Sequence, residues 1–238
     1  MQKWYQLKAV EDHADLYIYG DICQMEWFES DASSFSLSKE LASLEGKPLN
    51  VHINSYGGEV KEGIAMYNLL KDYKGEVTTV CDGFACSAAS MVFMAGTNRI
   101  MHSTSLLMIH NAWTVTDGNA DQLRKTADDL EKMTEPSITA YVEASHLERD
   151  EIKAMMDAET WITAEEALEY GFATAIVDDN EAKQSFKDSV ILGLVRKVKE
   201  LEKPEMKRII PVVEIEMTVD EQTNIDETPS STGWFFHK

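Results

Sequence analysis

The stretch LNVHINSYGG at residues 49–58 decides the fold, because it joins a strand to a helix through a glycine turn. Its first half is apolar and β-branched, as a buried strand requires. After the turn, Val60, Ile64 and Tyr67 recur at the spacing of one helix face. A strand, a tight turn and an amphipathic helix in this order predict one βα unit.

The same alternation continues on both sides of this unit. Further short apolar runs predict strands at residues 15–19, 77–81, 99–101 and 105–109. A charged stretch with Leu123, Ala127, Leu130 and Thr134 on one face predicts a long helix that continues past Pro136. We therefore expect an α/β fold with a largely parallel sheet between about residues 16 and 177.

The chain divides by composition into two parts, a domain at residues 1–184 and a C-terminal extension at 185–238. Residues 185–203 can form one amphipathic helix, and the acidic residues that follow predict a flexible tail. The segment GWFF at 233–236 is either a docking peptide or a terminus packed on a neighbouring surface.

Composition limits the partners. The chain of 238 residues carries 42 acidic and 22 basic side chains, a net charge of −20, which argues against nucleic acid and anionic lipid as partners. No apolar run is long enough to span a membrane, and the N-terminus lacks a signal-peptide pattern. Three cysteines without CxxC spacing give little support for disulfides. We therefore expect a cytoplasmic protein.

The turn at residues 54–58 is the first candidate site. Gly57 and Gly58 let the backbone pass close to a ligand, and their N–H groups beside a helix N-terminus can hold an anion. The alternative is a plain connection between strand and helix.

The second candidate is Ser87, in the segment GFACSAAS at residues 83–90. Small neighbours leave room for a substrate backbone, so Ser87 is placed to act as a nucleophile. It can also be only the N-cap of the apolar helix that follows. Ser90 and Cys86 would point elsewhere around the helix and are expected to fill the core.

The third candidate is His110, at the end of the apolar strand 105–109. A mostly neutral imidazole can accept the proton of a serine, although many strand-end histidines are structural. His52 and His102 carry the same ambiguity. The six histidines show no HxxxH or HxH pairing, so no zinc site is expected.

An anion cradle, a serine among small residues and a strand-end histidine are the parts of a covalent acyl-transfer site. Such a site also needs an acid to orient the imidazole. The 42 carboxylates give no physical reason to choose one.

These motifs, in this order, resemble the ClpP family of serine peptidases, together with the stretch TAEEALEYG at residues 163–171. The resemblance runs from about Leu16 to Asp178 and implies that Ser87 is the nucleophile and His110 the general base. It also implies an oxyanion hole of the Gly57 and Ala88 N–H groups, with Gly58 as the alternative donor.

The same resemblance suggests the acid. In the family an aspartate usually stands two residues before an aromatic residue, and here Trp161 is that aromatic residue. Glu159 occupies the aspartate position, with Asp157 as the alternative. Tyr56 replaces the proline common in the glycine turn.

The family has a crotonase-like spiral of βαβ units with a projecting handle helix, which residues 117–144 resemble. Its members form homo-oligomeric rings that enclose the active sites. No cofactor or metal is implied, and the substrate is a peptide or protein.

Within the family, the Trp161 segment and the acidic tail most resemble the head-maturation proteases of tailed bacteriophages. These would cleave capsid or scaffold protein inside an assembling procapsid. The alternatives are an ATP-dependent proteolytic subunit that works with a AAA+ unfoldase, a non-proteolytic crotonase-like acyl-CoA enzyme, and a catalytically silent ring.

Overall fold

A computed structural model describes residues 6–9, 12–25 and 32–177 of the chain. The predicted C-terminal extension, with its helix, acidic tail and aromatic end, lies outside these residues. So does the predicted domain boundary between residues 184 and 185.

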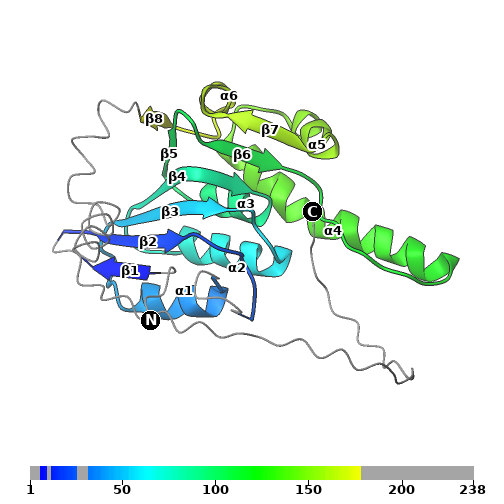
Figure 1. Ribbon diagram of the computed structural model, residues 1–238, viewed down its shortest axis with the longest axis horizontal. Helices are drawn as coiled ribbons and strands as arrows, with labels where there is room; N and C mark the ends of the chain where they lie inside the picture. The colour runs from blue at the N-terminus through cyan, green and yellow to red at the C-terminus, as the bar shows by residue number, and fades with distance from the viewer. Residues whose placement is uncertain (1–5, 10–11, 26–31, 178–238) are drawn as a thin grey trace, which may run out of the picture. The chain divides into compact units, whose positions relative to one another are not determined.

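One mixed sheet organises the described residues (Figure 1). Its strands are β1 (Gln6–Ala9), β2 (Ala14–Ile18), β3 (Leu49–Ser55), β4 (Val77–Cys86), β5 (Asn98–His102), β6 (Leu106–Ile109), β7 (Thr160–Thr163) and β8 (Ala175–Val177). The order is β1-β2-β3-β4-β5-β8, while β6 pairs with β4 and β7. Among the described strands, the β1–β2 and β6–β7 pairs are antiparallel and the others parallel, which confirms the α/β prediction.

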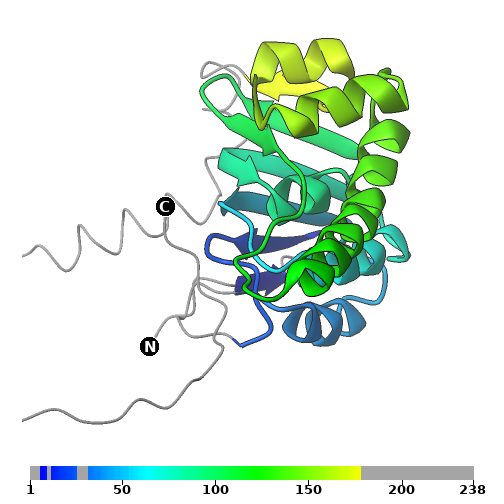
Figure 2. The same ribbon diagram turned by 90° about the vertical axis from the view of Figure 1, so that its right-hand side faces the viewer.

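Helices supply the crossover connections that parallel strands require. They are α1 (Ser34–Ala42), α2 (Val60–Lys71), α3 (Ala88–Phe93), α4 (Ala120–Ala144), α5 (Arg149–Asp157) and α6 (Ala164–Tyr170). Figure 2 shows α1, α2 and α4 on one side of the sheet. The core includes strand residues such as Leu16, Val51 and Ile53, which are fully buried. Each such side chain contributes roughly 1.5–3 kcal/mol by leaving water.

Strand β4 is the element that creates the site. It was predicted to end at residue 81 but runs on to Cys86, because it changes partner along its length. It pairs with β5 through Cys81 and with β6 from Phe84 to Cys86. Its last residues therefore lie beside β6, and the chain then turns at Ser87 into the buried helix α3.

Helix α4 has two different halves. Its buried residues are Thr134, Ile138, Ala140 and Tyr141, all in the C-terminal half, whereas the first half extends past the sheet (Figure 1). A capping box between Asn119 and Gln122 satisfies backbone groups at the N-terminus of α4. The first half of the helix is therefore stabilised by local contacts. The helix includes Pro136, as predicted.

No helix in the described parts of the chain has the length and apolar content needed to cross a lipid bilayer.

Candidate active site

Ser87 lies at the turn between β4 and α3, with φ 55° and ψ −124°. This is a left-handed region that favours glycine. The Ser87 N–H donates to the carbonyl oxygen of Met108 at 2.9 Å, which ties the turn to β6. Ser87 occupies the N-cap position of α3, but its side chain makes no capping hydrogen bond. The alternative that Ser87 serves only as a cap is therefore wrong.

His110 follows the last residue of β6 and faces the serine. The pairing of Cys86 with Met108 brings the ends of β4 and β6 together, and His110 Nε2 lies 2.7 Å from Ser87 Oγ. Burial lowers the pKa of His110 below 6.5, while the negative charge of Glu159 acts in the opposite direction. The imidazole is thus held in its neutral form, which can accept the serine proton.

Glu159 lies one residue beyond the strand pairing that leads to His110. The antiparallel β6–β7 ladder pairs Met108 with Trp161 and Ile109 with Thr160, and it ends there. Glu159 has φ 53°, which turns the chain between α5 and β7. Its charge acts on the imidazole, as the pKa of His110 reflects.

Asp157, the alternative acid, has another partner. Its Oδ1 accepts a hydrogen bond from Asn111 Nδ2 at 2.8 Å. Asp157 therefore contacts the residue after His110, and Glu159 is the carboxylate whose charge acts on the imidazole.

The glycine turn packs directly against the serine. A Cβ placed on Gly57 would lie 2.5 Å from the carbonyl oxygen of Cys86 and 2.9 Å from Ser87 Cβ. The Gly57 N–H, however, donates to Ser55 Oγ at 3.0 Å. The Gly58 N–H has no acceptor among the described residues, and the Ala88 N–H, first in α3, lacks an intrahelical one.

The other hydroxyl and thiol near Ser87 are buried. Ser90 is fully buried, donates to the Ser87 carbonyl oxygen at 2.6 Å and lies 2.8 Å from the Tyr141 hydroxyl. Burial raises the pKa of Cys86 to about 12, so this thiol is not ionised near neutral pH. Both residues belong to the core, as expected.

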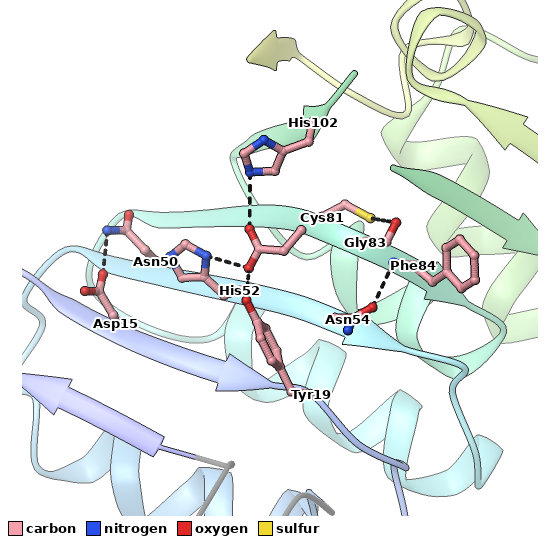
Figure 3. A network of polar contacts seen from close by, with 10 residues as sticks. Asp15, Tyr19, Asn50, His52, Asn54, Cys81, Gly83, Phe84 and His102 are labelled. Atoms are coloured by element: carbon pink, nitrogen blue, oxygen red, sulfur yellow. Dashed lines mark hydrogen bonds and ion pairs between the residues drawn. The ribbon is translucent and has the colours of Figure 1, made fainter. Parts of the chain in front are cut away.

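His52 and His102 belong to a separate network centred on Asp82 (Figure 3). Asp82 Oδ2 lies 2.9 Å from His52 Nδ1 and accepts a hydrogen bond from the Tyr19 hydroxyl. Asp82 Oδ1 makes no hydrogen bond of standard geometry but lies 3.4 Å from His102 Nε2, an ion-pair distance. Burial alone would raise the pKa of Asp82, but the contacts from His102, His52 and Tyr19 outweigh it and lower the pKa to about 2.

This network spans four neighbouring parts of the sheet, since Tyr19 follows β2 and the other three residues lie on β3, β4 and β5. Within the described residues, no group of three or more His, Cys, Asp or Glu side chains is arranged to hold a metal ion.

The arrangement as a whole can perform nucleophilic chemistry. A serine and a neutral imidazole are in hydrogen-bond contact, and a carboxylate acts on that imidazole. Within the described residues, the N–H groups of Gly58 and Ala88 at the adjoining turns have no main-chain acceptor. Sequence reasoning missed Ser55 and Asn111, whose side chains hold the Gly57 amide and Asp157. The sequence could have indicated both residues, because Ser55 lies in the glycine-turn motif INSYGG and Asn111 directly follows His110 in MIHN.

Comparisons with known proteins show what the whole domain is similar to. The sequence profile of the Clp protease family matches residues 21–180. An ATP-dependent Clp protease proteolytic subunit from Bacteroides thetaiotaomicron is 31% identical over 153 residues, which cover 62% of this chain and 70% of the relative. The protein of that name from Porphyromonas gingivalis is 31% identical over 137 residues, which cover 57% of this chain and 62% of the relative. Among solved structures, a mutant of ClpP1 from Listeria monocytogenes superposes with a TM-score of 0.59 at 26% identity, covering 70% of this chain and 92% of the other.

Proposed function

Because the chain belongs to the Clp protease family and is thus a serine-type peptidase, we propose that Ser87 is its nucleophile and His110 its general base. The observation that carries this assignment is the 2.7 Å contact between His110 Nε2 and Ser87 Oγ. Glu159 is the third member, because its charge favours the protonated imidazole that forms during attack. The longer glutamate thus takes the place usual for aspartate.

The reaction proceeds through an acyl-enzyme. His110 accepts the proton of Ser87 as Oγ attacks the carbonyl carbon of a peptide bond, and the carbonyl oxygen becomes an oxyanion. The imidazolium then gives its proton to the leaving amine, and the C–N bond breaks. Water, deprotonated by His110, attacks the ester, and the acid product leaves as Ser87 regains its proton.

The oxyanion donors are the N–H groups of Ala88 and Gly58. Gly57 was the first expectation, but its N–H already donates to Ser55 Oγ. Gly58 is adjacent and its N–H has no acceptor among the described residues, which favours the alternative register of the turn. Gly57 is then the residue that lets the turn approach Ser87.

We propose that the protein works as the proteolytic subunit of a Clp-type protease in the bacterial cytoplasm. The relatives at 31% identity carry the name ATP-dependent Clp protease proteolytic subunit, which supports this role over phage head maturation. The partners would be further copies of the chain in a ring, a AAA+ unfoldase, and unfolded protein as substrate. The exposed first half of α4 suits contact with another subunit.

Head maturation on capsid or scaffold protein stays a prediction. Co-purification with a AAA+ unfoldase and stimulation of cleavage by ATP would support the Clp role. Cleavage of a capsid or scaffold protein without ATP would support the phage role instead.

Labelling with a fluorophosphonate probe tests the chemistry. We expect a covalent adduct on Ser87, and loss of both labelling and peptide cleavage in Ser87→Ala by about 10⁶-fold. A crotonase-like acyl-CoA enzyme or a silent ring would not label at Ser87. Cleavage by Ser87→Ala at the parental rate would refute the assignment.

A further inference from the structure

A hydrogen bond joins Asn111 and Asp157, which lie close in sequence to His110 and Glu159, the two residues proposed to assist Ser87. Asn111 directly follows His110, and Asp157 stands two residues before Glu159. The Nδ2 to Oδ1 distance is 2.8 Å. One side-chain contact thus joins the segment that carries the imidazole to the segment that carries the carboxylate.

This contact lies where the main-chain ladder has ended. The β6–β7 pairing stops at Ile109 and Thr160, because the chain before Thr160 turns at Glu159 into the end of helix α5. Beyond that point no strand hydrogen bond sets the distance between the two segments. The Asn111–Asp157 bond continues the connection past the catalytic pair.

The segment after His110 and the segment around Glu159 each make further hydrogen bonds to neighbouring helices. On one side, the N–H of Ala112 donates to Thr134 Oγ1 of helix α4 at 3.1 Å, and Thr134 is buried. On the other side, the N–H of Glu159 donates to the Met156 carbonyl oxygen at 3.2 Å, and Thr160 Oγ1 donates to that of Met155 at 2.7 Å. Neither set of contacts links the two segments to each other.

We propose that Asn111 and Asp157 are positioning residues, which hold His110 and Glu159 at the separation needed for proton transfer. The inference rests on the proposed function of Ser87, His110 and Glu159. Asp157 therefore has a task of its own at the site, although it is not the acid of the triad. A displacement of about 1 Å in such a group can cost on the order of 10²-fold in rate.

An exchange of the two side chains tests the hydrogen bond itself. Asn111→Asp places two carboxylates at the contact, and we expect kcat to fall by roughly 10-fold or more with KM little changed. Asp157→Asn leaves a neutral oxygen that can still accept from Asn111, so kcat should stay within about 3-fold of the parent. The double variant reverses donor and acceptor, and its kcat should return to that of Asp157→Asn.

The measurements are kcat and KM across pH and the rate of fluorophosphonate labelling at Ser87. The loss should persist on the alkaline plateau, where His110 is neutral in every variant, because geometry rather than protonation has changed. Asp150→Asn, on the same helix and exposed, is the matched control and should behave as the parent. Asn111→Ala and Asp157→Ala, which remove the bond without adding charge, give a second test if Asn111→Asp unfolds.

Parental kcat in Asn111→Asp and Asn111→Ala would overturn the proposal, and so would a double variant no faster than Asn111→Asp. Failure of the proposed function looks different, because Ser87→Ala would then keep its labelling and cleavage. A loss of kcat that occurs only on the acidic side of the pH profile would assign the effect to charge, and it would also contradict the positioning role.

Discussion

Gly57 abuts Ser87 so closely that a single added methyl group would lie 2.9 Å from the serine Cβ. The same methyl group would lie 2.5 Å from the carbonyl oxygen of Cys86 and 2.9 Å from the Ala88 nitrogen. Since all three atoms belong to the turn that bears the proposed nucleophile, residue 57 controls the shape of that turn.

Gly57→Ala should therefore lower kcat/KM by about 10² or more per folded molecule, because the turn must move away from Ser87. Gly46→Ala is the matched control, since Gly46 also has a left-handed φ, +84°, but its nearest neighbour atom would be 3.6 Å away. It should cost about 1–2 kcal/mol of stability and leave kcat/KM unchanged. Equal activity of the two variants would contradict the role of Gly57.

The acidic limb of the kcat/KM profile should titrate below pH 6.5, because burial lowers the pKa of His110 and the neutral form is the active one. Glu159→Gln removes the negative charge that raises this pKa. In this variant the acidic limb of the kcat/KM profile should move to still lower pH, and kcat/KM on the plateau should fall. Kinetics between about pH 4 and pH 9 check both effects. A shift to higher pH in Glu159→Gln would rule out Glu159 as the acid.

Asp82 should stabilise the fold at neutral pH and lose this effect in acid. Its pKa is about 2 in the folded chain against 3.8 for the ordinary group, so the contribution is complete above the unfolded value and disappears as pH falls toward 2. The shift corresponds to about 2 kcal/mol. Urea unfolding of Asp82→Asn should show this deficit at pH 7 and a smaller one near pH 3, whereas Asp128→Asn, exposed on α4, should match the parent at both.

Ser90→Ala should destabilise the protein, because it removes the hydroxyl that contacts both the Ser87 carbonyl oxygen and the Tyr141 hydroxyl. The Tyr141 hydroxyl is fully buried and would lose its contact with Ser90 Oγ, at a cost of about 1–3 kcal/mol. Adding Tyr141→Phe removes the unpaired hydroxyl, so the double variant should be less destabilised than the sum of the single variants. Additive losses would show that the two hydroxyl groups do not interact.

The sequence predicted the parts of the fold that local pattern determines. The strand at Leu49, the glycine turn and the helix from Val60 were found because period and turn residues agree there. The short edge strands β1 and β8 and the antiparallel strand β7 were missed, since three or four residues carry no clear period.

At the site, Ser87 was a candidate because small residues surround it at the start of an apolar helix, and His110 was one because it follows an apolar strand. Spacing alone could not decide between Glu159 and Asp157, since the proposed choice depends on the charge that acts on His110 and on the contact between Asp157 and Asn111. The choice between Gly57 and Gly58 depends on a single acceptor, Ser55 Oγ. Such contacts join residues through geometry that composition and spacing do not encode.

The backbone at Ser87, with φ 55° and ψ −124°, is the conformation that a residue without a Cβ adopts most readily. The surrounding chain thus keeps a hydroxyl group where the peptide backbone would be more relaxed without any side chain. Ser87→Gly should melt at a higher temperature than Ser87→Ala, by an amount equivalent to about 1–2 kcal/mol. At position 87, stability against heat therefore favours glycine, whereas catalytic turnover requires the serine hydroxyl.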